Sequence, residues 1–163
     1  MSRTRLLGLM PLALLLGCSS TIVAAPATPT SKPTESSAAL ALRAWDEQRA
    51  AAYAAGSVGE LRSLYVDGSA VGAADVRLLR QYVERGFVIE GMQMQVLALD
   101  VLRETQALLR VRVTDRLVGA AARGSVGVLP LPQDSPTTRV VTLRAEGGSW
   151  RVASVRAERS GDA

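Results

Sequence analysis

The residues that could do chemistry in this chain are carboxylates and tyrosines, because the sequence contains no histidine and a single cysteine. Without histidine there is no Ser-His-Asp or Cys-His arrangement and no ordinary zinc site. A carboxylate base that works with a tyrosine hydroxyl stays open, as in an isomerase that moves a proton beside a carbonyl group. Asp115, Asp100 and Tyr53 are the candidates for such a pocket.

Of the three candidates, Asp115 has the sequence context that most clearly indicates a pocket residue. It continues the alternation of Leu109, Val111 and Val113, which would turn its carboxylate toward an apolar concavity and make it a candidate general base. The alternative is that the strand ends near Asp115, so that the carboxylate lies at the rim and pairs with an arginine or accepts a hydrogen bond.

The other two candidates also have structural explanations. Asp100 can lie at a strand edge or a bulge and pair with Arg103 or Arg112. Tyr53 can pack as an aromatic residue on a helix face. We therefore predict a protein without a catalytic residue, and keep a small-molecule isomerase or lyase that uses Asp115 with Tyr53 as the alternative.

Metal and phosphate sites are not indicated. Met92 and Met94 are expected to fill the core rather than bind a soft metal ion. Gly119, Gly124 and Gly127 lack the spacing and the following lysine of a phosphate-binding loop. We predict no metal and no cofactor.

The charge pattern argues against a nucleic-acid-binding protein. The chain has a formal net charge of +4, and its arginines are spread among aspartates and glutamates. A nucleic-acid site would need a concentrated basic stripe with interleaved aromatic residues. We expect no nucleic-acid partner.

The N-terminal residues have the layout of an export signal. Arg3 and Arg5 precede an apolar run over residues 6–16, which is too short to span a bilayer, and Gly17 precedes Cys18. This stretch resembles the lipobox of bacterial lipoprotein precursors. The resemblance implies that residues 1–17 are a signal peptide and that Cys18 carries diacylglyceryl and palmitate chains. The protein would then be anchored by lipid to the cell membrane, on its extracytoplasmic face. Ordinary cleavage after Ala24 or Ala25 is the alternative.

The domain organisation follows from composition and local signals. Residues 18–37 are rich in serine, threonine and proline and are predicted to form a disordered tether, residues 38–158 a single folded domain, and residues 159–163 a tail. Ser36 or Ser37 can cap a helix that runs to about Ala55 and ends at Gly56. A capping box at residues 57–60 opens a short second helix, and apolar spacing predicts a third over residues 73–85.

The pattern then changes to a period of two. Residues 92–103, 107–117, 139–146 and 150–157 are predicted strands, and a change of parity within the first indicates a bulge and a bent strand. A Gly-Gly hairpin joins the last two strands, and residues 118–136 are predicted to be a long connection rich in glycine and proline. The expected core contacts of the last two strands are Val141, Leu143, Trp150 and Val152.

The order of helices followed by a curved sheet, together with several short sequence segments, resembles that of the nuclear transport factor 2-like superfamily. The segments that carry the likeness are Ala44-Trp45-Asp46, Ala54-Ala55-Gly56-Ser57 and Leu64-Tyr65 in the helices, with Val140-Val141-Thr142-Leu143 and Gly148-Ser149-Trp150-Arg151-Val152 in the closing hairpin. The resemblance spans residues 38–158. It implies an α+β cone, with three N-terminal helices packed on a strongly curved antiparallel sheet of about four long strands.

The resemblance and the chemistry together favour a non-catalytic binding or scaffold module of the bacterial cell envelope. Such a cone can bind an apolar small ligand at its mouth or an envelope protein partner. An accessory role within an envelope complex would instead require an exposed apolar patch. Fold alone does not decide among these functions.

Overall fold

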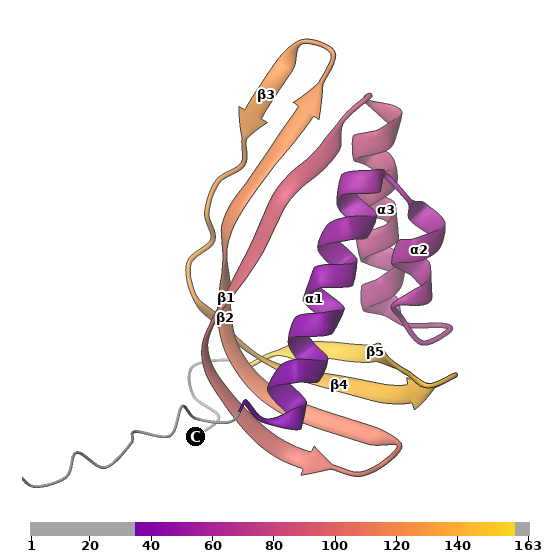
Figure 1. Cartoon of the computed structure of the whole chain (residues 1–163), viewed down its shortest axis with the longest axis vertical. Helices are drawn as coiled ribbons and strands as arrows, with labels where there is room; N and C mark the ends of the chain where they lie inside the picture. The colour runs from indigo at the N-terminus through magenta and orange to yellow at the C-terminus, as the bar shows by residue number, and fades with distance from the viewer. Residues whose placement is uncertain (1–34, 159–163) are drawn as a thin grey trace, which may run out of the picture. The chain divides into compact units, whose positions relative to one another are not determined.

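Three helices precede five strands in residues 35–158, the part of the chain that the computed structural model describes (Figure 1). The predicted signal peptide, Cys18, the tether as far as residue 34 and the tail lie outside the described residues. None of the described helices is long and apolar enough to cross a bilayer. The elements are α1 (Ser37–Ala55), α2 (Val58–Ser63), α3 (Ala70–Glu84), β1 (Val88–Glu104), β2 (Leu108–Gly124), β3 (Gly127–Pro130), β4 (Thr137–Glu146) and β5 (Ser149–Ala157).

The five strands form one antiparallel sheet in the order β1-β2-β4-β5, with β3 paired to the far end of β2. The sheet bends around the helices, which lie on its concave side (Figure 1). The bend coincides with four register shifts between β1 and β2, as expected when bulges add residues to one strand of a pair. The predicted α+β class, with three helices on a curved antiparallel sheet, is confirmed.

Local signals set the helix ends. The Ser36 hydroxyl accepts a hydrogen bond from the amide of Ala39 at the start of α1, and Gly56 ends the helix with a φ of 63°. The Ser57 hydroxyl accepts from the amide of Glu60 and so caps α2. The third helix begins earlier than predicted, at Ala70 instead of residue 73, because Ser69 caps it by accepting from the Gly72 amide.

The prediction of a long connection over residues 118–136 was wrong. β2 continues to Gly124 and turns back into β3. Two glycines in this stretch allow close packing, because a Cβ on Gly124 would lie 2.6 Å from the ring of Phe87 and a Cβ on Gly119 would lie 3.2 Å from the carbonyl oxygen of Gly91. Glycine at these positions therefore allows neighbouring groups to approach the strand.

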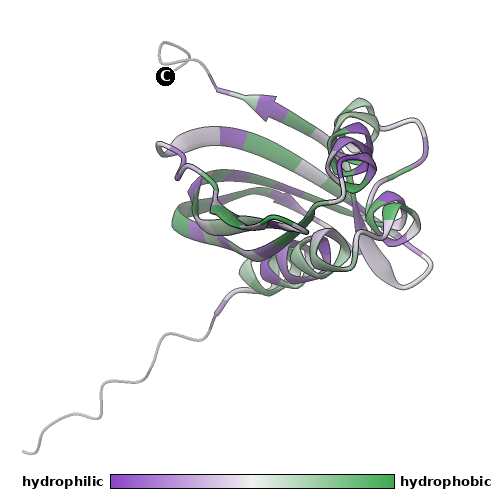
Figure 2. Cartoon of the chain, turned by 90° about the horizontal axis from the view of Figure 1, so that it is seen from above, coloured by the Kyte–Doolittle hydropathy of each residue, from purple (hydrophilic) through white to green (hydrophobic). Residues whose placement is uncertain are grey.

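The core lies between the helices and the concave face of the sheet. Hydrophobic and hydrophilic residues alternate along the strands and helices around it (Figure 2). Three of the four core contacts predicted for β4 and β5 are buried, and Trp150 is partly buried against the core. Trp45 is also partly buried, where its indole Nε1 donates to the carbonyl oxygen of Leu64 and its ring meets Tyr65 edge to face. The buried residues include Leu61, Leu79, Ile89, Leu109, Val111, Val113, Leu143 and Val152.

Candidate functional site

The cone contains a cavity of about 450 Å³ between α1, α3 and the concave face of the sheet. Apolar side chains from both layers form most of its wall, and a few charged and aromatic polar groups interrupt it. The charged residues of the wall are Asp46, Arg49, Asp75, Asp134 and Arg139. The cone is therefore hollow, with room for a small organic molecule.

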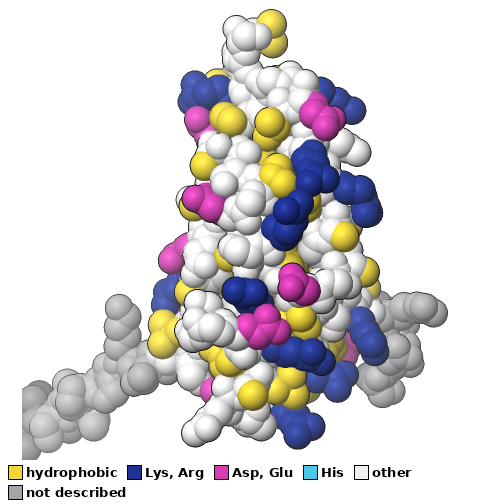
Figure 3. All heavy atoms as spheres, turned by 90° about the vertical axis from the view of Figure 1, so that its right-hand side faces the viewer, with side chains coloured by type: hydrophobic (Ala, Val, Ile, Leu, Met, Phe, Trp, Pro, Cys, Tyr) yellow, Lys and Arg dark blue, Asp and Glu magenta, His cyan; other side chains and the backbone are white. Residues whose placement is uncertain are grey.

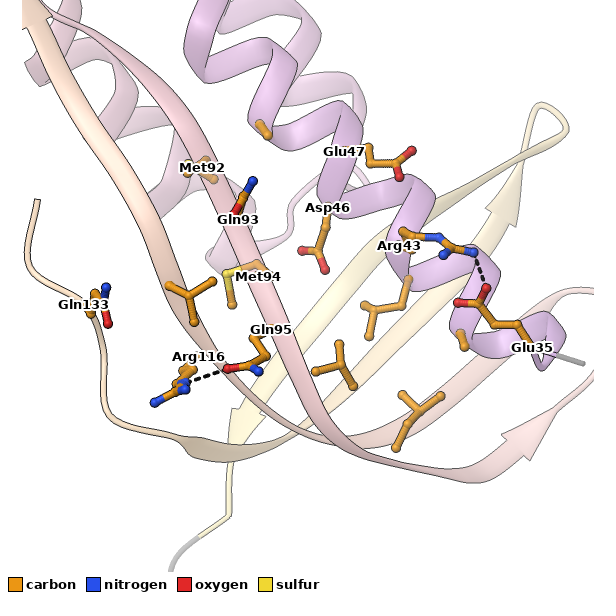
Figure 4. Close-up of a pocket in the computed structure, with 16 residues that line it drawn as sticks. Glu35, Arg43, Asp46, Glu47, Met92, Gln93, Met94, Gln95, Arg116 and Gln133 are labelled. Carbon is orange, nitrogen blue, oxygen red and sulfur yellow. Dashed lines mark hydrogen bonds and ion pairs between the residues drawn. The ribbon is translucent and has the colours of Figure 1, made fainter. Parts of the chain in front are cut away.

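A larger groove of about 910 Å³ adjoins this cavity where α1 faces β1. The two hollows share four lining residues: Leu42, Asp46, Met92 and Met94. Asp46 points from α1 toward the strands, whereas its neighbour Glu47 points away from them (Figure 4). Asp46 thus lies where the groove meets the cavity.

Asp46 makes no hydrogen bond or ion pair within residues 35–158. Burial raises the pKa of its carboxyl to about 6, and the negative charge of Asp115 acts in the same direction, against the opposing charges of Arg49 and Arg139. A carboxyl group with this pKa changes its charge near neutral pH, which is unusual for aspartate. Asp46 is therefore a group of this site whose charge depends on pH near neutrality.

Asp115 lies in the middle of β2 and is 1% exposed. The Nη2 atom of Arg139, on β4, donates to its Oδ2 at 2.5 Å. The Oδ1 of Asp115 and the Nε of Arg139 are both buried and have no hydrogen-bond partner within the described residues. The alternation of apolar residues predicted that Asp115 points inward, and the structure shows this. The alternative prediction, that the strand ends near Asp115 and places it at the rim, was wrong, because β2 continues for nine residues beyond Asp115.

A second cluster ties the helices together around Asp75 on α3. Its Oδ1 accepts from the Tyr53 hydroxyl at 2.8 Å and from Nη2 of Arg49 at 2.6 Å. Its Oδ2 accepts from the Tyr65 hydroxyl at 2.6 Å and from Nε of Arg49 at 2.7 Å. All three partner side chains come from within the helical layer and the segment that follows α2, so the cluster fixes one wall of the cavity.

The electrostatics of this cluster are those of a satisfied ion pair. Burial works against the charged form of Asp75, but the hydrogen bonds and the charge of Arg49, with the two tyrosine hydroxyls, outweigh it and lower the pKa of the carboxyl. Burial, followed by the charge of Asp75, raises the pKa of Tyr53 and Tyr65. Both tyrosines are therefore neutral hydrogen-bond donors whose protons are directed to Asp75.

The structure does not bring the predicted pocket residues together. Tyr53 lines the cavity, but its hydroxyl is bound to Asp75, and Asp115 is bound to Arg139. Asp100 is exposed on β1. It faces Arg112 in the β1–β2 ladder, yet the Arg112 guanidinium donates to Glu158 at 2.8 Å. The ion pairs predicted for Asp100 with Arg112 or Arg103 are not formed within the described residues.

Sequence reasoning missed Asp46, Arg49 and Asp75. A signal was present on α3, because Asp75 occupies the same buried face as Gly72, Val76 and Leu79, at the spacing of a helix. A charged residue at an apolar-face position indicates a buried partner, since an unpaired charge would be costly there.

Comparison with known proteins supports the fold alone. No family model and no curated protein matches the chain. Among solved structures, the intermembrane space region of the chloroplast protein ARC6 is similar with a TM-score of 0.54 and 12% identity, over 78% of this chain and 100% of that one. Aln2 from a Streptomyces species is similar with a TM-score of 0.51 and 14% identity, over 78% of this chain and 94% of that one. These likenesses show that the chain shares its α+β fold with proteins of very different sequence.

Proposed function

We propose that this protein is a lipid-anchored, extracytoplasmic lipoprotein of the bacterial cell envelope whose cone binds a small, largely apolar ligand without catalysing a reaction. The observation that carries the proposal is the cavity of about 450 Å³ inside the cone, joined to an open groove beside α1. Hollows of this size with few polar groups are the usual form of small-molecule sites.

The positions of the polar groups support binding over catalysis. A proton-transfer enzyme needs a base and a hydrogen-bond donor that converge on one point of the substrate. Here the Tyr53 hydroxyl is directed to Asp75, and the Asp115 carboxylate is held by Arg139. An isomerase or lyase that uses Asp115 with Tyr53 is therefore the less favoured candidate.

The surface supports the absence of a nucleic-acid partner. On the face shown in Figure 3, arginine side chains lie among acidic and apolar ones. Several arginines also pair with acids, including Arg112 with Glu158 and Arg123 with Glu90. A mixed surface of this kind lacks the concentrated positive field that phosphate backbones require.

A cavity-filling variant tests ligand binding. Ala120 lines the cavity, whereas Ala98 is exposed on β1. We expect Ala120→Phe to weaken the binding of a neutral solvatochromic dye about tenfold or more, equivalent to about 1.4 kcal/mol, and Ala98→Phe to leave it unchanged. Fluorescence titration measures both. Equal binding by the two variants would show that the dye does not enter the cone.

The anchor is tested separately, because it depends on residues outside the described part of the chain. We expect Cys18→Ala to remain unprocessed or to leave the membrane fraction, since the tether and domain offer no other lipid-attachment residue. Mass spectrometry of the native protein checks whether Cys18 carries lipid. An unmodified Cys18, or cleavage near Ala25, would contradict the lipoprotein assignment.

A further inference from the structure

The charges around the cone cavity do not balance. Four carboxylates, those of Asp46, Asp75, Asp115 and Asp134, lie in or behind its wall, with two guanidinium groups, those of Arg49 and Arg139. Arg49 is paired with Asp75 at 2.6 Å and Arg139 with Asp115 at 2.5 Å. Both cations are therefore in contact with other carboxylates, and within residues 35–158 Asp46 has no ion-pair partner of its own, although the charges of Arg49 and Arg139 act on it.

The other elements packed against Asp46 do not supply that counter-charge. The groove beside α1 contains Arg43 and Arg116, but Arg43 pairs with Glu35 and Arg116 donates to Gln95 at 2.8 Å (Figure 4). Strand β1 contributes only uncharged residues to the two hollows. The remaining charged group of the cavity wall is Asp134, which adds a further negative charge.

Two more buried polar atoms, on residues whose charges act on Asp46, have no hydrogen-bond partner in the described part of the chain. They are the Oδ1 of Asp115, which can only accept a hydrogen bond, and the Nε of Arg139, which can only donate one. An unpaired buried acceptor is costly unless another molecule satisfies it. Arg139 and Asp46 line the cavity, whereas Asp115 lies behind its wall. The carboxylate oxygens of Asp46 are therefore acceptors that reach the cavity without a hydrogen-bond donor among residues 35–158, and an ammonium group can supply donors from its three N–H groups.

We propose that the cone binds an organic cation, an amine with a compact apolar body, whose ammonium group pairs with Asp46 and whose body fills the cavity behind it. This inference rests on the proposed ligand-binding function and names the chemical class of the ligand. The same excess of negative charge disfavours a carboxylate or phosphate ligand.

The test compares three molecules that differ only in their head group: 4-phenylbutylamine, 4-phenylbutanol and 4-phenylbutyrate. The full chain in a non-ionic detergent is titrated with each by calorimetry at pH 7.5. We expect the amine to bind about tenfold more tightly than the alcohol, and the carboxylate to bind more weakly than both. Asp46→Asn should abolish the preference for the amine and leave alcohol binding unchanged, which also reports that the variant is folded. Glu47→Gln is the matched control: Glu47 lines the groove but not the cavity and points away from the strands, so this variant removes an equal charge and should retain the preference.

The wild-type protein provides a second measurement that needs no variant. As the pH falls from 7.5 to 5, protonation of Asp46 should remove the preference for the amine, while alcohol binding stays constant. Equal affinity for amine and alcohol at pH 7.5, or a preference that survives Asp46→Asn, would overturn the assignment of a cationic ligand while leaving the binding cavity intact. Failure of all three molecules to bind would instead overturn the proposed ligand-binding function, and the inference with it.

Discussion

Asp46 should lower the stability of the empty protein at neutral pH, so its replacement by asparagine should stabilise the fold. Its carboxyl has a pKa raised from 3.8 to about 6 in the folded chain. The folded state therefore favours the protonated form. This contribution to stability is fully present below about pH 4 and is lost as the pH rises through 6, when the buried carboxylate must ionise without a partner.

The magnitude follows from the size of the rise. One pKa unit corresponds to about 1.4 kcal/mol, so the change from 3.8 to about 6 sets an upper limit of about 3 kcal/mol on the penalty at pH 8. Asp46 is partly buried, and water screens part of its charge. We therefore expect the free energy of unfolding of Asp46→Asn, relative to wild type, to be about 1–3 kcal/mol higher at pH 8 than at pH 4. Comparing two pH values for the same pair of proteins removes the effect of the amide's own hydrogen bonds.

Urea unfolding followed by tryptophan fluorescence measures this difference, because Trp45 lies one residue from Asp46 and packs against the core. Wild type, Asp46→Asn and the exposed control Glu47→Gln are unfolded at pH 4, 6 and 8 without ligand. The stability gap between wild type and Asp46→Asn should open between pH 4 and 8, and Glu47→Gln should show no such gap. A gap that is constant with pH, or a less stable Asp46→Asn at pH 8, would refute the account of Asp46 as an unpaired buried carboxylate.

Two further predictions concern the helical wall. Asp75→Asn should reduce the free energy of unfolding by about 3–5 kcal/mol in urea titrations, because it leaves the Arg49 charge uncompensated beside two tyrosine hydroxyls. The control is Glu90→Gln, which breaks an exposed ion pair and should cost about 0–1 kcal/mol. Since the pKa of Asp75 is lowered, the contribution of its carboxylate to the free energy of unfolding should be complete above about pH 4 and should fade as the pH falls further. A loss of stability in Asp75→Asn that is the same at pH 2.5 and 7 would contradict this. Gly72→Ala should cost about 1–3 kcal/mol in thermal or urea unfolding, because the new Cβ would lie 2.5 Å from the Tyr65 ring, and an unchanged midpoint would show that the ring moves freely.

The helices could be predicted from the sequence because their signals are local. Ser36, Gly56 and Ser57 act on backbone groups within four residues along the chain, so their types alone indicate where a helix begins or ends. The α+β order could be predicted in the same way, from the change in hydrophobic period after residue 86.

The second half of β2 could not be predicted, because its glycines respond to partners far along the chain. Gly124 accommodates the Phe87 ring, and Gly119 accommodates the Gly91 carbonyl oxygen. In the sequence alone, a segment with glycines at these positions resembles a loop. The register that brings them together is set by long-range pairing of β1 with β2.

The candidate site was predictable only in part for the same reason. Alternation indicated that Asp115 points inward, and helical spacing placed Tyr53 on a packed face, and the structure shows both. Their partners, Arg139 and Asp75, are 24 and 22 residues away in sequence, and the pairing depends on how β4 and α3 meet the rest of the cone. Asp46 is distinguished by a carboxyl group that has no hydrogen-bond or ion-pair partner among residues 35–158, a property that no local pattern reveals.

The opposite walls of the cavity differ in how freely they can change shape. Asp75 anchors three side chains through both of its oxygens, so α1, α3 and the segment after α2 are held together on that side. Across from it, Met92 and Met94 border both hollows, and unbranched thioether side chains adopt many rotamers at little cost. Selectivity should accordingly be uneven: strict for the part of a guest molecule that meets the wall fixed by Asp75, and tolerant of size and branching in the part that meets the two methionines.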